Sequence, residues 1–335
     1  MKRTLLIAAL AVLALTSIWA ATRKTDTQKV VVAYVFRPNT TIDPTLMTHI
    51  NYAFGHVTDT FNGVRINNPE HLKQVVALKK QNPDLKVLLS IGGWGSGNFS
   101  EMAADDRLRG EFAQACKQVA DTYRLDGIDI DWEYPTVSSA GISSSPDDTE
   151  NFTLLIRDLR KALGNDMLIT LATGATAKNI NFPDIMPYID FVNIMAYDMA
   201  TVPHHHASMH YADSTIMTVQ RAVQAHIDAG VPTHKLVLGL PFYGKGTLRI
   251  PRGTTIEQVK ADSMLTEHWN EEGQYPYLTD STERVVYTFD NARSLTIKCQ
   301  YALMRNLRGT MYWEASCDDD ILTLSRAVWH ATTGK

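Results

Sequence analysis

Short apolar runs alternate with longer segments of helical periodicity along most of the chain. The apolar runs are continuous and rich in β-branched residues, which is typical of strands buried on both faces of a parallel sheet. The pattern predicts strands at 29–36, 49–54, 86–91, 126–135, 167–172, 191–196, 235–240 and 309–313. It predicts helices at 68–81, 106–123, 148–163, 182–188, 214–229, 291–306 and 318–331.

This regular alternation decides the expected fold class. Eight strands alternating with helices over about 300 residues predict an α/β protein with a single (β/α)8 barrel, the TIM barrel. An open doubly wound sheet is the alternative, but Arg37-Pro38-Asn39 stands where that fold carries its glycine fingerprint. An irregular segment at about 245–286 is expected to form a small insertion between strand seven and its helix. We therefore expect one domain at 22–335.

Residues 1–21 have the pattern of a secretory signal peptide. Lys2 and Arg3 precede an apolar run at 5–15, and small residues follow up to Ala21. An uncleaved membrane anchor is the alternative, but the run is shorter than the roughly 20 apolar residues that a spanning helix needs. No cysteine directly follows the run, which argues against a lipoprotein. We expect a secreted or periplasmic protein with no membrane contact after cleavage.

Composition narrows the classes of function. The 335 residues are 44% hydrophobic and 20% charged, with a net charge of -4. This balance provides no basic surface, so nucleic acid binding is not expected. Cys116, Cys299 and Cys317 have neither the spacing of a zinc site nor the density of a disulfide framework. We expect buried thiols, and a single disulfide between two of them is the alternative. We also expect a monomer.

The segment 126–135, Asp-Gly-Ile-Asp-Ile-Asp-Trp-Glu-Tyr-Pro, carries the candidate chemistry. Because side chains alternate along a strand, Asp129, Asp131 and Glu133 are expected to share one face. Neighbouring carboxylates in a partly dry site cannot all ionise, so the row is expected to retain a proton. Glu133, at the end of the row, is the expected general acid. A solvated acidic edge strand would show the same alternation.

The same segment resembles the Asp-x-x-Asp-x-Asp-x-Glu motif of family 18 glycoside hydrolases, the chitinase family, at every fixed position. The resemblance is to secreted bacterial chitinases. It implies retaining hydrolysis of β-1,4 bonds between N-acetylglucosamine units, without metal or organic cofactor. Glu133 would protonate the glycosidic oxygen while the acetamido oxygen of the substrate attacks its own anomeric carbon. Asp131 would turn toward the acetamido N–H, Asp129 would hold the shared proton, and Tyr197 would donate to the acetamido oxygen.

Three further strand ends resemble the family in the same order. Ser90-Ile91-Gly92-Gly93 resembles Ser-x-Gly-Gly, Met195-Ala196-Tyr197-Asp198 resembles Met-x-Tyr-Asp, and Trp313 matches the tryptophan beneath the sugar. Because barrel enzymes carry their sites at the carboxyl ends of strands, these residues are expected to line one cleft. The expected substrate-binding residues are Trp313, Asp198, Met195, Tyr34, Phe54, Ser90, Gly92, Gly93, Trp94, Tyr134 and Tyr243. Core packing is the alternative for the aromatic residues.

A histidine run at 204–206, with His210 nearby, raises the question of a metal site. Consecutive histidines cannot all turn toward one ion, and acidic partners at ligand spacing are missing. We expect no metal here and a solvated loop at the rim of the cleft.

Other functions on the same fold stay open. A chitin-binding lectin would lack the terminal acid of the motif, whereas Glu133 is present. An endo-β-N-acetylglucosaminidase or a peptidoglycan hydrolase would use the same acids. Trp132 followed by Tyr134-Pro135 resembles the chitinase subgroup more closely. The expected partner is therefore chitin or a chitooligosaccharide.

Overall fold

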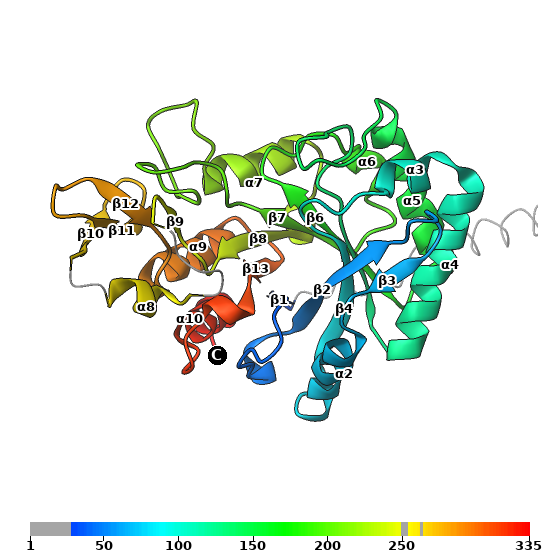
Figure 1. Cartoon of the computed structure of the whole chain (residues 1–335), viewed down its shortest axis with the longest axis horizontal. Helices are drawn as coiled ribbons and strands as arrows, with labels where there is room; N and C mark the ends of the chain where they lie inside the picture. Colours follow the sequence, from blue (N-terminus) through cyan, green and yellow to red (C-terminus); the bar gives the residue numbers. More distant parts are fainter. Residues whose placement is uncertain (1–27, 249–253, 262–263) are drawn as a thin grey trace, which may run out of the picture.

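The computed structural model describes residues 28–248, 254–261 and 264–335. The expected signal peptide lies outside these residues. In the described part of the chain, a ring of parallel strands consists of β1 (Val30–Val35), β2 (His49–Val57), β4 (Lys86–Gly92), β5 (Gly127–Asp131), β6 (Leu168–Gly174), β7 (Phe191–Met195), β8 (Leu236–Pro241) and β13 (Gly309–Trp313). β1 pairs with both β2 and β13, which closes the ring (Figure 1). The predicted (β/α)8 barrel is confirmed.

The barrel strands are buried on both sides. Every residue of β1, β5, β7 and β8 is buried. Ile128 and Ile130 of β5 belong to the large core shared with the helices, whereas Tyr34 and Met311 belong to a smaller core inside the barrel. This two-sided burial explains why the sequence shows continuous apolar runs rather than strands with one polar face.

Helices cover the outside of the ring (Figure 1). Those in the described ranges are α2 (Pro69–Ala77), α3 (Phe99–Ala104), α4 (Asp106–Tyr123), α5 (Asp148–Leu163), α6 (Phe182–Ile185), α7 (Val219–Asp228), α9 (Ala292–Met304) and α10 (Thr323–Thr333). The sequence predicted the bounds of α4 and α5 and missed α3. α7 begins five residues later than predicted, because the Thr218 side chain accepts from the Arg221 amide and caps the helix there. No described helix has both the length and the apolar character to cross a membrane.

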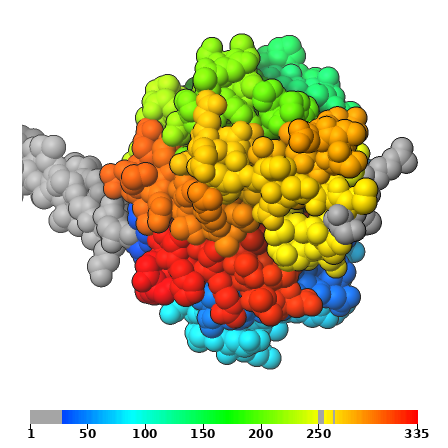
Figure 2. All heavy atoms as spheres, turned by 90° about the vertical axis from the view of Figure 1, so that its left-hand side faces the viewer, coloured from blue at the N-terminus to red at the C-terminus, as the bar shows by residue number. Residues whose placement is uncertain are grey.

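The insertion after β8 forms a second, antiparallel sheet. It contains β9 (Lys245–Gly246), β10 (Thr266–Asn270), β11 (Tyr275–Thr279) and β12 (Val285–Thr288), with α8 (Ile256–Lys260) beside them. The strand order is β10-β11-β12-β9. Figure 2 shows this yellow and orange part beside the red C-terminal segment. The sequence predicted the position of the insertion but not its regular strands. It has its own apolar core of Ile256, Val259, Leu278, Val286, Tyr287 and Phe289.

The cysteines are buried, as the sequence predicts. Cys116, Cys299 and Cys317 all carry free thiols in the described structure. Burial raises the pKa of Cys299 and of Cys317 to about 12. These thiols therefore stay protonated at neutral pH and serve as small apolar core groups.

Candidate active site

Asp129 lies at the centre of the site and is fully buried. The register of the parallel strands places Ser90 of β4 and Thr170 of β6 beside it. Its Oδ2 accepts hydrogen bonds from the hydroxyls of Tyr34 at 2.7 Å and Ser90 at 2.8 Å. Its Oδ1 accepts from the Thr170 hydroxyl at 2.6 Å and the Asn193 amide at 3.4 Å. Burial raises the pKa of Asp129, and these donors oppose that rise because they stabilise the ionised carboxylate.

Asp131 is the next acid on the same face of β5 and is only 3% exposed. Its Oδ1 has no hydrogen-bond partner among the described residues. Burial, with the neighbouring charges of Glu133 and Asp129, raises the pKa of Asp131 well above its ordinary value. The contacts therefore favour a proton on Asp131 in the free protein, whereas the family resemblance implies the shared proton on Asp129.

Glu133 lies two residues beyond the end of β5, although the sequence predicted that the strand continues to residue 135. Trp132 packs away from the barrel interior between the rings of Phe99 and Phe152, so the alternation of faces continues past the strand. Burial raises the pKa of Glu133 to about 7, and a hydrogen bond with Tyr134 opposes the rise. A carboxyl with this pKa is still partly protonated at neutral pH, as a general acid must be.

The glycine pair at the end of β4 allows the acidic strand to approach closely. Gly92 has a φ of +131°, and a Cβ there would lie 1.9 Å from the carbonyl oxygen of Asp131. Gly93 donates its backbone N–H to that same oxygen at 2.9 Å. A Cβ on Gly93 would lie 2.8 Å from the ring of Phe54. A side chain at Gly92 would displace the backbone of β5, and a side chain at Gly93 would displace the ring of Phe54 on β2.

A cavity of about 530 Å³ opens beside the acids at the carboxyl ends of the barrel strands. Asp129 and Ser90 lie outside its lining, where they hydrogen-bond to each other. Tyr134 also lies outside the lining. Its ring packs beside Gly174, and a Cβ on Gly174 would lie 3.1 Å from that ring. The remaining expected site residues line the cavity: Asp131, Glu133, Tyr197, Trp313, Asp198, Met195, Tyr34, Phe54, Gly92, Gly93, Trp94 and Tyr243.

Aromatic rings form one wall of this cavity. The ring of Trp313 stacks on that of Phe54, with centroids 5.5 Å apart and planes inclined by 23°. Tyr34 and Phe36 lie against the same tryptophan, with centroid separations of 5.7 and 6.0 Å. Trp94 is 65% exposed in the cavity lining. Such a wall suits the apolar face of a sugar ring.

Asp198 provides a fixed negative charge in the cavity. Its φ of 60° lies in the left-handed region. Its carboxylate accepts from the Tyr243 hydroxyl, forms an ion pair with Lys245 at 2.7 Å, and lies 3.3 Å from Nδ1 of His206. Burial alone would raise the pKa of Asp198, but these three partners outweigh it and hold the pKa well below its ordinary value. Asp198 is therefore ionised at neutral pH.

The expected solvated loop describes His204 and His210, which are exposed, but it is wrong for the two histidines between them. His205 and His206 are fully buried, and their rings stack with centroids 5.1 Å apart. His205 donates from Nε2 to the carbonyl oxygen of Phe289 at 2.8 Å and lies against the ring of Tyr275 on β11. The sequence missed this burial because the covering residues come from the insertion, some seventy positions later in the chain.

The cavity also contains residues that no pattern in the sequence indicated. A hairpin of β2 with β3 (Val64–Ile66) contributes some of them. Nδ1 of His56 lies 2.9 Å from the Ser96 hydroxyl, and its Nε2 lies 3.2 Å from the Asn67 amide. The turn signal Asn62-Gly63 could have revealed this hairpin. Tyr52 of β2 also lines the cavity, and the additional lining residues are Phe36, Pro38, Ala53, His56, Asn67, Asn68 and Ala172.

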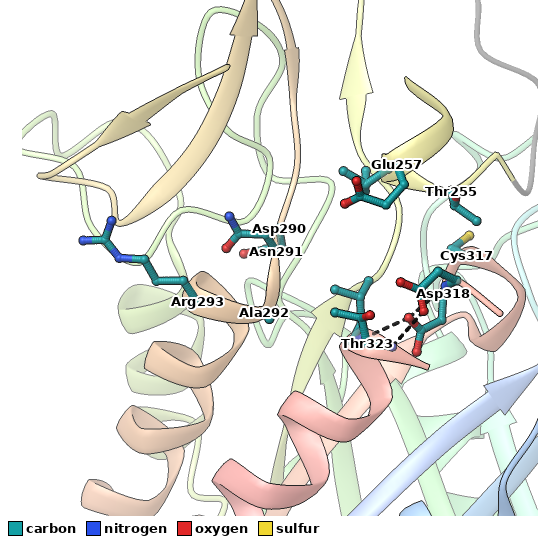
Figure 3. Close-up of a pocket in the computed structure, with 12 residues that line it drawn as sticks. Thr255, Glu257, Asp290, Asn291, Ala292, Arg293, Cys317, Asp318 and Thr323 are labelled. Carbon is teal, nitrogen blue, oxygen red and sulfur yellow. Dashed lines mark hydrogen bonds between the residues drawn. The ribbon is translucent and has the colours of Figure 1, made fainter. Parts of the chain in front are cut away.

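A second cavity, of about 240 Å³, lies between the insertion and the starts of α9 and α10 (Figure 3). Its acidic lining includes Glu257, Asp290 and Asp318. Asp318 accepts from the backbone amide of Leu324 at 2.9 Å and so caps α10, while Asp290 pairs with buried Lys298. In the part of the chain that the structure describes, no group of three His, Cys, Asp or Glu side chains is placed to hold a metal ion. The contacts of Asp290 and Asp318 therefore stabilise the fold, through an ion pair and a helix cap respectively.

Comparison with known proteins agrees with this architecture. The chain is 33% identical, with a TM-score of 0.81, to a solved structure described as a glycoside hydrolase family 18 N-acetylglucosaminidase from Paenibacillus barengoltzii. The match covers 91% of this chain and 100% of that one. A solved Group IV chitinase of Ostrinia furnacalis is 28% identical with a TM-score of 0.81, over 91% of this chain and 100% of that one.

Two curated proteins are similar in sequence. Chitinase A1 of Niallia circulans is 30% identical over 83% of this chain, and the match spans only 54% of that protein's length. Probable chitinase 2 of Drosophila melanogaster is 31% identical over 87% of this chain and 72% of its own length. The model of the family described as "Glycosyl hydrolases family 18" matches residues 17–318. The acidic strand, the barrel and these matches agree, and the chain belongs to glycosyl hydrolases family 18.

Proposed function

We propose that this protein hydrolyses β-1,4 bonds between N-acetylglucosamine units of chitin or chitooligosaccharides by a retaining, substrate-assisted mechanism. The observation that carries the proposal is Glu133, with a pKa raised to about 7, beside buried Asp131 in a cavity that also contains Trp313. Family membership and the relatives named as chitinases support it.

Glu133 acts first as an acid and then as a base. It protonates the glycosidic oxygen while the acetamido oxygen of the bound sugar attacks the anomeric carbon, which gives an oxazolinium ion. Because this attack is intramolecular, much of the entropic cost of supplying a nucleophile is removed. Glu133 then takes a proton from the water that opens the ring, and the configuration at the anomeric carbon is retained.

The residues around Glu133 stabilise the charge that develops on the sugar. We assign the proton of the free protein to Asp131, which turns toward the acetamido N–H when the sugar binds. Ionised Asp129 behind it compensates the positive charge of the oxazolinium ion. Burial and the charges of Asp131 and Glu133 raise the pKa of Tyr197 well above its ordinary value. Its hydroxyl therefore keeps its proton and donates to the acetamido oxygen.

The cavity lining provides the contacts for sugar binding. The stacked rings of Trp313 and Phe54 offer an apolar face to the pyranose ring, and ionised Asp198 accepts from a polar group of the substrate. We propose a monomer that needs no metal or organic cofactor and binds no nucleic acid.

Paired substrates test the requirement for the acetamido group. We expect new reducing ends from a chitin hexamer and none from a β-1,4-glucan hexamer of equal length. Cleavage of the glucan would contradict substrate assistance. Binding of the chitin hexamer without cleavage would favour the lectin alternative.

Release of single N-acetylglucosamine units is a second candidate, because the similar Paenibacillus barengoltzii structure is described as an N-acetylglucosaminidase. The product profile separates the two modes. Monomer as the sole early product from a chitin hexamer would support action at chain ends, whereas dimers to tetramers would support internal cleavage. A glycoprotein glycan and peptidoglycan, offered in parallel, test the two remaining substrate classes.

We also propose that the protein is secreted after cleavage near Ala21, because residues 1–21 have the charge and apolar pattern of a signal peptide. N-terminal sequencing of protein recovered outside the cytoplasm tests this. An intact leader on the recovered protein would contradict it.

A further inference from the structure

We propose that Thr170 is a positioning residue which, together with Asn193, holds Asp129 ionised and fixed, so that the proton of the acidic row resides on Asp131. This inference rests on the proposed function and assigns a role to two residues outside the family motifs described above.

The geometry around Oδ1 of Asp129 carries the inference. The Thr170 hydroxyl on β6 lies 2.6 Å from this oxygen, the shortest of the four contacts that the carboxylate makes. Nδ2 of Asn193 on β7 lies 3.4 Å from the same oxygen and can only donate. Both side chains are fully buried, so no solvent replaces a donor that is removed. With two donors on each oxygen, a proton on Asp129 would require one of the three hydroxyls to reverse and accept, or one of the contacts to break.

Asp131 has the opposite surroundings. Its Oδ1 lacks a hydrogen-bond partner in the described structure, so a proton there breaks no bond at that oxygen. The difference between these two neighbouring carboxyls decides which of them carries the proton. It also leaves Asp131 free to rotate, while four partners on four different strands restrain Asp129.

Few charged groups face Asp129. Tyr34 of β1 and Asp131 of β5 are the titratable groups that act on it among the described residues. Burial keeps the Tyr34 hydroxyl protonated, since it raises the pKa of Tyr34 well above its ordinary value. β4, β6 and β7 contribute Ser90, Thr170 and Asn193, which do not titrate. Loss of the Thr170 hydroxyl would therefore raise the pKa of Asp129 without removing a titratable group from its surroundings.

This change has a defined effect on activity. The proposed mechanism needs a negative charge behind the oxazolinium ion, and that charge disappears when Asp129 and Asp131 are both protonated. Thr170→Val should therefore move the acid limb of the pH profile of turnover to higher pH, by about one unit for the loss of one hydrogen bond to a charged group.

Thr173 offers a matched control on the same strand. It is also buried, and its hydroxyl lies 2.9 Å from Nε2 of His226, outside the barrel interior. The experiment measures turnover of a chitin hexamer against pH for the wild type, Thr170→Val, Thr170→Ser and Thr173→Val, with thermal unfolding to verify folding. We expect the shift in Thr170→Val, its reversal in Thr170→Ser, which keeps the hydroxyl, and a wild-type profile in Thr173→Val.

An unshifted acid limb in folded Thr170→Val, or an equal shift in Thr173→Val, would overturn the inference. If Thr170→Val does not fold, Thr170→Ala replaces it, because alanine and serine at this position differ only by the hydroxyl.

If the wild type does not hydrolyse the hexamer, the proposed function fails by itself, and the inference is tested without activity. Carbon-13 NMR of carboxyl-labelled aspartate then measures the titration of Asp129 directly. A higher pKa of Asp129 in the variant supports the inference, and an unchanged pKa overturns it.

Discussion

The carbonyl oxygen of Asp131 accepts a hydrogen bond from the backbone N–H of Gly93 at 2.9 Å, which fixes the end of the acidic strand against the end of β4. The same oxygen would lie 1.9 Å from a Cβ at Gly92. The position of the acids therefore depends on the absence of a side chain on the neighbouring strand.

Gly92→Ala should lower the free energy of unfolding by about 3 kcal/mol or more, because a backbone clash adds to the strain of a left-handed residue. Gly141→Ala is the control, since Gly141 has a φ of +76° and no atom would lie within 4 Å of its Cβ. We expect the control to lose only about 1 kcal/mol. Urea unfolding measures both, and equal losses would contradict the close approach.

Glu133 should make stability depend on pH. Its pKa in the folded protein is about 7, above the ordinary value of 4.5, so the folded state binds this proton more tightly than the unfolded state. The contribution of Glu133 to stability is therefore greatest at low pH and is lost as the pH rises from about 4.5 to 7. Glu133→Gln removes this titration. As the pH rises from 4 to 7.5, the free energy of unfolding of the variant should increase by about 2 to 3 kcal/mol relative to that of the wild type, as measured by urea unfolding. A pH-independent difference would show that the pKa is not raised.

Trp313→Ala should raise KM for a chitin hexamer by about tenfold, because the sugar loses its stacking surface. Trp269→Ala is a suitable control, since Trp269 lies on β10 beneath the guanidinium of Arg293 and outside the cavity. Initial-rate kinetics of both variants separate loss of substrate contact from loss of an aromatic residue in general. Similar KM values for the two variants would exclude Trp313 from the binding surface.

The buried ion pair of Lys298 and Asp290 should matter for folding. Nζ lies 2.5 Å from the carboxylate, and both side chains are fully buried. Lys298→Met leaves a buried carboxylate without its counter-charge and should cost about 3 to 5 kcal/mol of unfolding free energy. The double variant Lys298→Met with Asp290→Leu should recover part of this loss. No recovery would mean that the pair contributes packing rather than charge compensation.

Much of the fold could be predicted from the sequence, because strands buried on both faces leave continuous apolar runs. α4 and α5 were predicted to the residue, since clear helical periodicity and acidic residues mark their starts. α3 and the β2–β3 hairpin were missed because they are short. The strands of the insertion, Thr266–Asn270 among them, were missed because their alternation is interrupted by polar residues.

For the site, the sequence could predict which residues gather but not their environments. The motif residues lie around one cavity because parallel strands end at the same rim. The sequence could not assign different surroundings to Asp129 and Asp131, because the four donors to Asp129 come from four other strands. It also could not predict the burial of His205 and His206, which depends on side chains of the insertion. The catalytic and binding roles of the motif residues stay predictions.

Turnover of a chitin hexamer by Glu133→Gln, relative to the wild type at saturating substrate and neutral pH, tests the central claim most directly. Glutamine keeps the shape of the side chain but has no carboxyl proton to donate, so we expect turnover to fall by about 1,000-fold or more while the oligosaccharide still binds. Turnover within about tenfold of the wild type would contradict the assignment of Glu133 as the proton donor.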